Sequence, residues 1–165
     1  MNCKRLLKHL ALPPWLVGRA FPPATMQVIE AAIANSEQRH LGQIRFAVEE
    51  SLELAPLWRG MTGRDRAVEV FADLRVWDTE HNNGVLVYLL LADRDVEIVA
   101  DRGIHAAVGE AAWEEVCRTM EGALREGQFE TGVVKGIEAI GALLATHFPR
   151  QTPGANELPD VPVVL

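Results

Sequence analysis

The feature that most constrains this sequence is a pair of short apolar runs separated by a charged turn. The runs cover residues 85–91 and 96–100, and the turn covers residues 92–95. Each run has the length of a buried strand, whereas a membrane-spanning helix needs about 18 or more apolar residues. Two strand-length runs joined by a polar turn predict a β-hairpin.

Polar residues stand at both outer ends of this hairpin. Residues 78–84 precede the first strand and end in Asn-Asn-Gly, and residues 101–103 follow the second strand and read Asp-Arg-Gly. A hairpin folds its two outer ends together, so these polar segments should lie side by side. The hairpin therefore predicts a candidate site at that edge of the sheet.

The remaining sequence surrounds the hairpin with helices and one more strand. Alternation of Ile44, Phe46 and Val48 predicts a strand over 43–49. Apolar residues at helical spacing, with capping residues and stops, predict four helices, over 24–41, 62–77, 110–126 and 129–147. We expect loops at 50–61 and 104–109. The order predicts an α/β protein with a small mixed sheet that contains one antiparallel hairpin.

The composition limits the size of the domain and the classes of partner that the protein can bind. The chain has 165 residues, 48% of them hydrophobic, and so can bury one core; we expect an N-terminal arm at 1–23, one domain at 24–149 and a flexible Pro-rich tail at 150–165. Its formal net charge of −7 argues against a nucleic-acid partner. Cys3 and Cys117 suggest no disulfide framework, and no apolar run predicts a transmembrane segment.

The first residues bear on localisation. Lys4, Arg5 and Lys8 precede an apolar stretch at 10–17, which resembles the start of a targeting segment. Two prolines interrupt that stretch and Arg19 closes it without a cleavage signal. We therefore expect a cytoplasmic protein whose arm packs on the domain; the alternative is a membrane-associated or exported protein.

The candidate site gathers residues from four segments. If the strand at 43–49 and the first hairpin strand form a right-handed parallel unit, their N-terminal ends share one edge of the sheet. The first helix ends immediately before that edge. The predicted constellation is therefore Glu37, His40, Asp78, Asn82, Asn83, Asp101 and Arg102.

The oxygens of this constellation suit a hard divalent cation, calcium or magnesium. The candidate metal ligands are Asp101, Asp78, Glu37, Asn82 and Asn83. His40 could carry a proton or join a mixed metal site, and Arg102 could hold a phosphate or pair with Asp101. Asn-Asn-Gly and Asp-Arg-Gly are also ordinary turn sequences, so a cap of the sheet without chemistry is an open alternative.

Two segments of the hairpin resemble the TPM domain family, which includes a thylakoid lumen protein of photosystem repair and many bacterial proteins. They are residues 82–89, Asn-Asn-Gly-Val-Leu-Val-Tyr-Leu, and residues 96–104, which end in Asp-Arg-Gly-Ile. The similarity covers residues 24–149. It implies a three-layer α/β/α sandwich, divalent-cation binding around Asp101 and the acid phosphatase activity proposed for the plant member. Many members carry a signal peptide and a C-terminal membrane helix, and this chain departs from that pattern.

Two functions follow. In the first, the domain is a metal-assisted phosphatase on an unknown phosphate ester: Asp101 holds the cation, and Arg102 or His40 assists catalysis. In the second, it is a noncatalytic interaction domain with a structural cation that assists the assembly or maintenance of a membrane protein.

Overall fold

The computed structural model describes residues 3–13, 15–151 and 155–165. Within them, one mixed sheet has the strand order β3-β2-β1-β4. Its strands are β1 (Gln43–Glu49), β2 (Gly84–Leu90), β3 (Asp95–Ala100) and β4 (Val163–Val164). β1 runs parallel to β2 and to β4, and β2 and β3 form the predicted antiparallel hairpin. Both strand pairings predicted from the sequence, β1 with β2 and β2 with β3, are confirmed.

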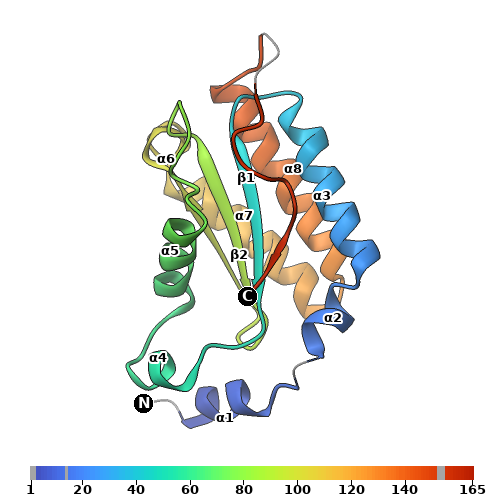
Figure 1. Ribbon diagram of the computed structural model, residues 1–165, viewed down its shortest axis with the longest axis vertical. Helices are drawn as coiled ribbons and strands as arrows, with labels where there is room; N and C mark the ends of the chain where they lie inside the picture. Colours follow the sequence, from blue (N-terminus) through green and yellow to red (C-terminus); the bar gives the residue numbers. More distant parts are fainter. Residues whose placement is uncertain (1–2, 14, 152–154) are drawn as a thin grey trace.

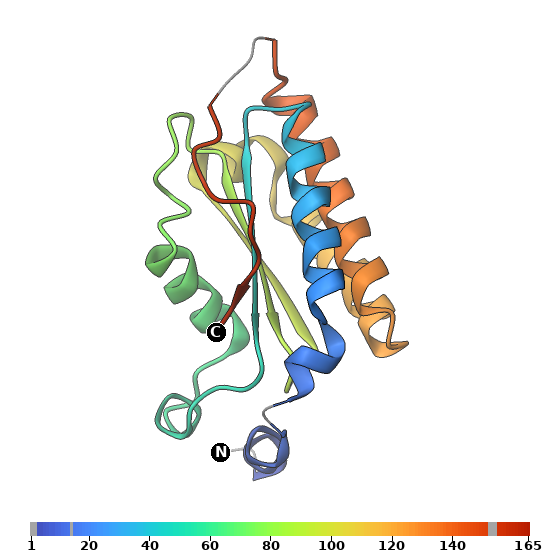
Figure 2. The same cartoon turned by 45° about the vertical axis from the view of Figure 1, so that its right-hand side comes forward.

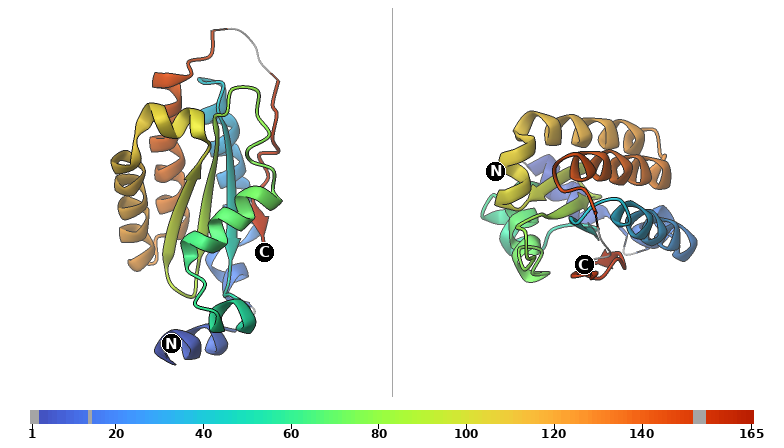
Figure 3. Two further views of the ribbon diagram at one scale, coloured as in Figure 1. Left: turned by 90° about the vertical axis from the view of Figure 1, so that its left-hand side faces the viewer. Right: turned by 90° about the horizontal axis from the view of Figure 1, so that it is seen from above.

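Helices cover both faces of the sheet (Figures 1 and 3). One face is covered by α3 (Pro23–Glu37), α7 (Glu110–Arg125) and α8 (Phe129–His147), and the other by α5 (Gly63–Asp73). The three-layer α/β/α sandwich is thereby confirmed. The short helices are α1 (Cys3–Ala11), α2 (Leu16–Ala20), α4 (Leu54–Trp58) and α6 (Arg102–Val108). In the described part of the chain, no helix is long and apolar enough to cross a membrane.

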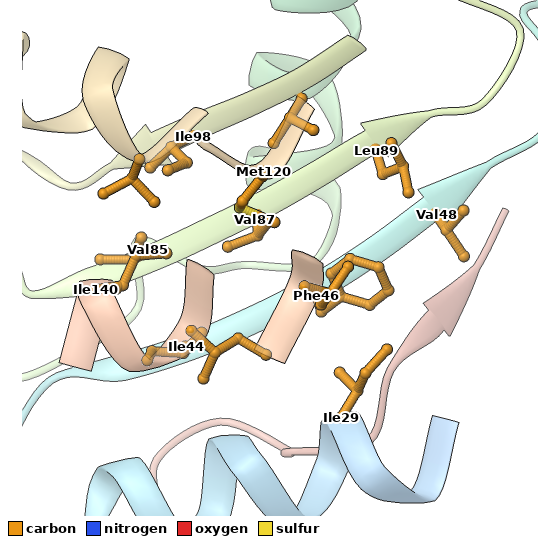
Figure 4. Packing of buried hydrophobic residues seen from close by; sticks show 14 of the residues in the cluster. Ile29, Ile44, Phe46, Val48, Val85, Val87, Leu89, Ile98, Met120 and Ile140 are labelled. Atoms are coloured by element: carbon orange, nitrogen blue, oxygen red, sulfur yellow. The ribbon is translucent and has the colours of Figure 1, made fainter. Parts of the chain in front are cut away.

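The alternation of β2 divides the core into two clusters. Val85, Val87 and Leu89 pack beneath α3, α7 and α8, as Figure 4 shows, whereas the intervening residues Leu86 and Tyr88 pack toward α5. Every residue of β2 is buried, because helices cover both faces of this central strand. The strand therefore reads as a continuous apolar run rather than as an alternating one.

A charged group lies inside the core cluster between the sheet and α5, which we call the α5 cluster and which includes Leu86, Tyr88, Ala67 and Val70. Glu49 Oε2 accepts hydrogen bonds from Tyr88 Oη at 2.6 Å and from Arg66 Nε at 2.9 Å. Burial and the neighbouring carboxylate raise the pKa of Tyr88. The arginine supplies the charge that a carboxylate at this depth requires, so β1, β2 and α5 are tied together by one network.

Several predicted boundaries differ from the structure. The second helix ends at Asp73 rather than near 77, because Arg75 adopts a left-handed φ of 53°. The connection expected at 104–109 is largely the helix α6, and the loop expected at 50–61 contains α4. The N-terminal arm contains α1 and α2. The arm buries Val17 but leaves Trp15 exposed.

The prediction of a flexible C-terminal tail is wrong for residues 155–165. Leu158 is buried, and β4 pairs with Ala47 and Val48 of β1. Gln43 Oε1 accepts hydrogen bonds from the backbone N–H groups of Glu157 and Leu158, both at 2.8 Å. The tail extends the sheet because these backbone contacts hold it along β1.

Candidate functional site

The beginnings of β1 and β2 and the end of β3 meet at one end of the sheet, at the top of Figure 1. Asp101 N donates to Gly84 O at 2.8 Å, and Gln43 N donates to Asn83 O at 3.3 Å. We call residues 37–43, 78–84 and 101–103 the polar end. The structure brings these segments to one end of the sheet, and the predicted side chains have different surroundings there.

Asp101 is the N-cap of α6 and is almost fully buried. Its Oδ1 accepts a hydrogen bond at 2.7 Å from Arg102 N, the first N–H of the helix, rather than from the second or third N–H that an N-cap side chain usually binds. Its other oxygen, Oδ2, is buried and has no hydrogen-bond partner in the part of the chain that the structure describes. A buried carboxylate oxygen without a partner is costly, so a donor, a water molecule or a cation bound to this atom would stabilise the folded protein.

Asn83 shows the same deficit one residue before β2. Its backbone is satisfied, since its N–H donates to Thr79 Oγ1 at 3.1 Å and its carbonyl accepts from Gln43 N. Its side chain is fully buried, and neither Oδ1 nor Nδ2 finds a partner among the described residues. Leaving such a group unpaired costs about 1–3 kcal/mol, which an added ligand or water would relieve.

Backbone carbonyls and two glycines complete the local structure. A Cβ added at Gly103 would lie 2.6 Å from Asn82 O and 2.9 Å from His81 O, so both carbonyl oxygens lie against the start of α6. A Cβ added at Gly84 would overlap with the Val76 carbonyl. The glycines of Asn-Asn-Gly and Asp-Arg-Gly are therefore required by close backbone approach.

Glu37 lies at the polar end but is occupied by other contacts. Its Oε1 accepts from Ile44 N at 2.7 Å and its Oε2 from Gln43 Nε2 at 3.3 Å. Burial raises the pKa of Glu37 to about 8, and nearby Asp160 acts in the same direction. As placed, the carboxyl fastens the end of α3 to β1 and, through Gln43, to the tail.

His40 is also enclosed. Its Nδ1 lies 3.0 Å from Gly42 O and its Nε2 lies 3.0 Å from Ser36 Oγ. Since a carbonyl can only accept, Nδ1 carries the proton and Nε2 accepts from the serine. Burial lowers the pKa of His40 to about 4. Both ring nitrogens are therefore engaged in holding the turn after α3.

Asp78 and Arg102 lie at the surface. Asp78 Oδ2 is 3.1 Å from Arg75 Nη2, an exposed ion pair of small energetic value. The Arg102 side chain is exposed beside Asp101. Of the predicted ligands, then, Asp101 and Asn83 have buried oxygens without partners among the described residues, whereas Asn82 is exposed and its backbone carbonyl accepts from Ile104 N at 3.2 Å.

Within the described ranges, no group of three His, Cys, Asp or Glu side chains is placed to hold a metal ion. A cation at the polar end would therefore depend on amide and carbonyl oxygens around the one carboxylate of Asp101. Calcium accepts such mixed oxygen ligands, whereas zinc prefers nitrogen and sulfur.

Sequence reasoning missed the roles of Gln43, Arg45 and Thr79. Arg45 Nη1 donates to Pro159 O, so β1 holds the tail with two polar side chains. A polar residue at alternate positions of a strand is a visible signal, but it normally indicates a solvated face. The partner of these side chains is more than a hundred residues away in the sequence.

Comparison with known proteins agrees with the fold and with the motifs of the hairpin. The TPM domain family matches residues 18–143. The solution structure of BA42 from the psychrophilic bacterium Bizionia argentinensis is 30% identical, with a TM-score of 0.76, over 86% of this chain and 92% of that one. The N-terminal domain of a P. gingivalis protein shares the fold at 15% identity, with a TM-score of 0.62, over 86% of this chain and 95% of that one. A comparison with curated proteins gives no match.

Proposed function

This chain belongs to the TPM domain family, and we propose that it binds a divalent cation at the polar end, calcium or magnesium, held by Asp101. The observation that carries the proposal is the buried Oδ2 of Asp101, which has no partner among the described residues. A cation would supply the opposite charge that this oxygen lacks.

The donor set fits a hard cation. Asp101 Oδ2 and Asn83 Oδ1 are buried oxygens without partners in the described part of the chain, and the carbonyls of His81 and Asn82, the second of which also accepts from Ile104 N, lie against the neighbouring start of α6. A cation would not satisfy Asn83 Nδ2, which needs an acceptor such as water. Calcium, which accepts carboxylate, amide, carbonyl and water oxygens together, is the better candidate.

The enclosed His40 favours a noncatalytic role for such a cation. A general acid or base must lie within hydrogen-bond reach of the reacting group, and both ring nitrogens of His40 are engaged within the turn. The cation would then order the polar end as a binding surface, and the partner would be a membrane protein or another assembly component.

Arg102 supports the second candidate function, metal-assisted phosphate-ester hydrolysis. Its exposed guanidinium follows Asp101 directly and could hold a phosphate beside the cation site. When bound, the cation would polarise a phosphoryl oxygen. Arg102 would orient the ester, and Asp101 would fix the position of the charge.

Titration with calcium and magnesium, followed by amide NMR, tests the cation proposal. Saturable shifts are expected at Gly84, Asp101 and Gly103, and Asp101→Ala should remove them. Asp73→Ala is the matched control, because Asp73 is an exposed aspartate at the end of α5. Shifts that persist in Asp101→Ala, or their absence in the native protein, would refute the site.

Phosphatase activity separates the two functions. If the domain is an enzyme, cation-dependent hydrolysis of a general phosphate ester should fall at least about tenfold in both Asp101→Ala and Arg102→Ala. If it is a binding domain, the native protein and both variants show the same residual rate while calcium still binds the native protein.

A further inference from the structure

Exposed apolar side chains gather at the opposite end of the molecule from the polar end. Leu7 and Leu10 of α1, Trp15, and Leu54 and Trp58 of α4 are each between 54% and 66% exposed. α1 packs against α4, and Figures 1 and 2 show both helices below the sheet. We call α1, Trp15 and α4 the apolar end.

The inner face of α1 is firmly attached to the domain. Arg5 donates to Asp93 Oδ2 at 2.8 Å and to Met61 O at 2.7 Å, so it joins α1 to the turn of the hairpin. His9 Nδ1 accepts from Leu52 N at 3.0 Å, and His9 Nε2 lies 3.2 Å from Asp93 Oδ2. These contacts determine which face of the helix points away from the protein.

The outer face of α1 combines apolar and basic residues. At 100° per residue, an arc on the side of α1 away from His9 contains, in order, Leu10, Leu7, Ala11, Lys4 and Lys8, and each of these five side chains is exposed. Within this arc the two leucines lie on one side and the two lysines on the other. A helix with such a face is suited to the boundary between water and lipid.

Charge distinguishes this end from the rest of the protein. Residues 1–29 contain Lys4, Arg5, Lys8 and Arg19 and no aspartate or glutamate, although the whole chain has a formal net charge of −7. The Arg19 guanidinium lies 5.9 Å from the centre of the Trp15 ring. Glu53 and Arg59 cap the two ends of α4, and their opposite charges offset each other.

We propose that the apolar end docks on the surface of a membrane that contains anionic lipid. Leu7, Leu10 and the indoles of Trp15 and Trp58 would enter the headgroup region, where tryptophan is favoured, while Lys8 contacts lipid phosphates and Lys4 adds positive charge beside it. A second copy of this chain is a poorer occupant, because a symmetric contact would place lysines near lysines.

The docking is reversible and depends on salt. A basic residue near an anionic surface adds only modestly to the binding energy, and a short helix that lies in the interface buries little apolar area, so neither contribution suffices alone. The polar end, at the other end of the sheet, then faces away from the lipid and stays accessible.

Vesicle flotation tests the proposal. We expect the full chain to float with phosphatidylcholine vesicles that contain phosphatidylglycerol, and not with phosphatidylcholine alone. The bound fraction should fall as salt is raised, and tryptophan emission should shift to the blue as Trp15 and Trp58 leave water.

Variants of both kinds separate the two contributions. Lys4→Glu combined with Lys8→Glu, and Leu7→Ser combined with Leu10→Ser, should each reduce vesicle binding at least tenfold. Lys135→Glu on α8 and Val68→Ser on α5 are matched exposed controls and should bind as the native protein does. Urea unfolding of each variant shows that the domain remains folded.

Three outcomes would overturn the proposal. They are equal binding to neutral vesicles, unchanged binding in both double variants, and self-association in sedimentation equilibrium that Leu7→Ser with Leu10→Ser abolishes without any lipid binding. The last outcome would identify a second copy of the chain as the occupant.

Discussion

The two ends of the sheet are incomplete in opposite ways. At the polar end, Asp101 Oδ2 and the Asn83 amide are buried and have no polar partner among the described residues. At the apolar end, Leu7, Leu10 and Trp58 are each more than half exposed to water. A small ligand that enters the protein would pair the buried polar atoms at the first end. A surface that covers the exposed apolar side chains would remove them from water at the second end. We propose on these grounds that one domain binds a cation at one end and a membrane at the other.

The two ends also differ in how closely the chain is packed. Gly84 and Gly103 leave no room for a Cβ, whereas nothing lies within 4 Å of a Cβ added at Gly18, in the short helix next to the apolar end. Substitutions at the polar end should therefore change stability, and substitutions at the apolar end should change binding alone.

Glu37 should give the largest effect on stability. Its pKa of about 8 in the folded protein lies above the ordinary value of 4.5, so folding becomes less favourable as pH rises between those values, by up to about 5 kcal/mol. Glu37→Gln should flatten this slope. Urea unfolding of both proteins between pH 4.5 and 8 measures it, and Glu30→Gln on the same helix is the control. Equal slopes would show that the carboxyl is not desolvated.

Gly84→Ala should destabilise the domain by about 3 kcal/mol or more, because the new methyl group overlaps with a backbone carbonyl of Val76 that cannot rotate away. Gly122→Ala on α7 is the matched control; no atom lies within 4 Å of its new Cβ, and it should stabilise by up to about 1 kcal/mol. Chemical unfolding compares them. Equal stabilities would mean that the polar end is as loosely packed as the surface of α7.

His40 should act in the opposite direction to Glu37. Its pKa of about 4 lies below the ordinary 6.5, so stability falls as pH falls between those values, by about 2–3 kcal/mol. The two effects oppose each other between about pH 4.5 and 6.5, and each variant should reveal the other residue's slope. His40→Asn keeps a donor for Gly42 O, and the exposed His147→Asn serves as control. Identical pH profiles for the two histidine variants would contradict the assignment.

Leu7→Ser with Leu10→Ser should have the smallest effect on stability, within about 0.5 kcal/mol, because both side chains are already in water. Thermal unfolding without vesicles measures it. A loss above 2 kcal/mol would show that these leucines pack against the protein in solution, and the contrast between the ends would disappear.

Local periodicity explains what could be predicted from the sequence. The alternation in 43–49, the two runs of the hairpin and the helical spacing of the four long helices each report on neighbours a few residues away, and these elements form. The sequence also predicted that Asn83, Gly84 and Asp101 lie close together, because a hairpin brings its two outer ends side by side.

Contacts that depend on tertiary packing could not be predicted. The Pro-rich composition of the tail indicated flexibility, but Gln43 and Arg45 hold its backbone along β1. Glu37 was placed correctly at the polar end, but its hydrogen bonds to Ile44 and Gln43 depend on the angle at which α3 meets the sheet. Helical spacing gives the face of a residue and not the partner that it meets.

The buried position of Tyr88 has an optical consequence. It is the single tyrosine of the sequence, and its hydroxyl donates to Glu49 inside the α5 cluster. Its phenol should resist ionisation in alkaline solution for as long as β1, β2 and α5 stay together. The appearance of tyrosinate absorbance then reports the opening of the central sheet, separately from the indole emission of Trp15 and Trp58, which reports contact with lipid.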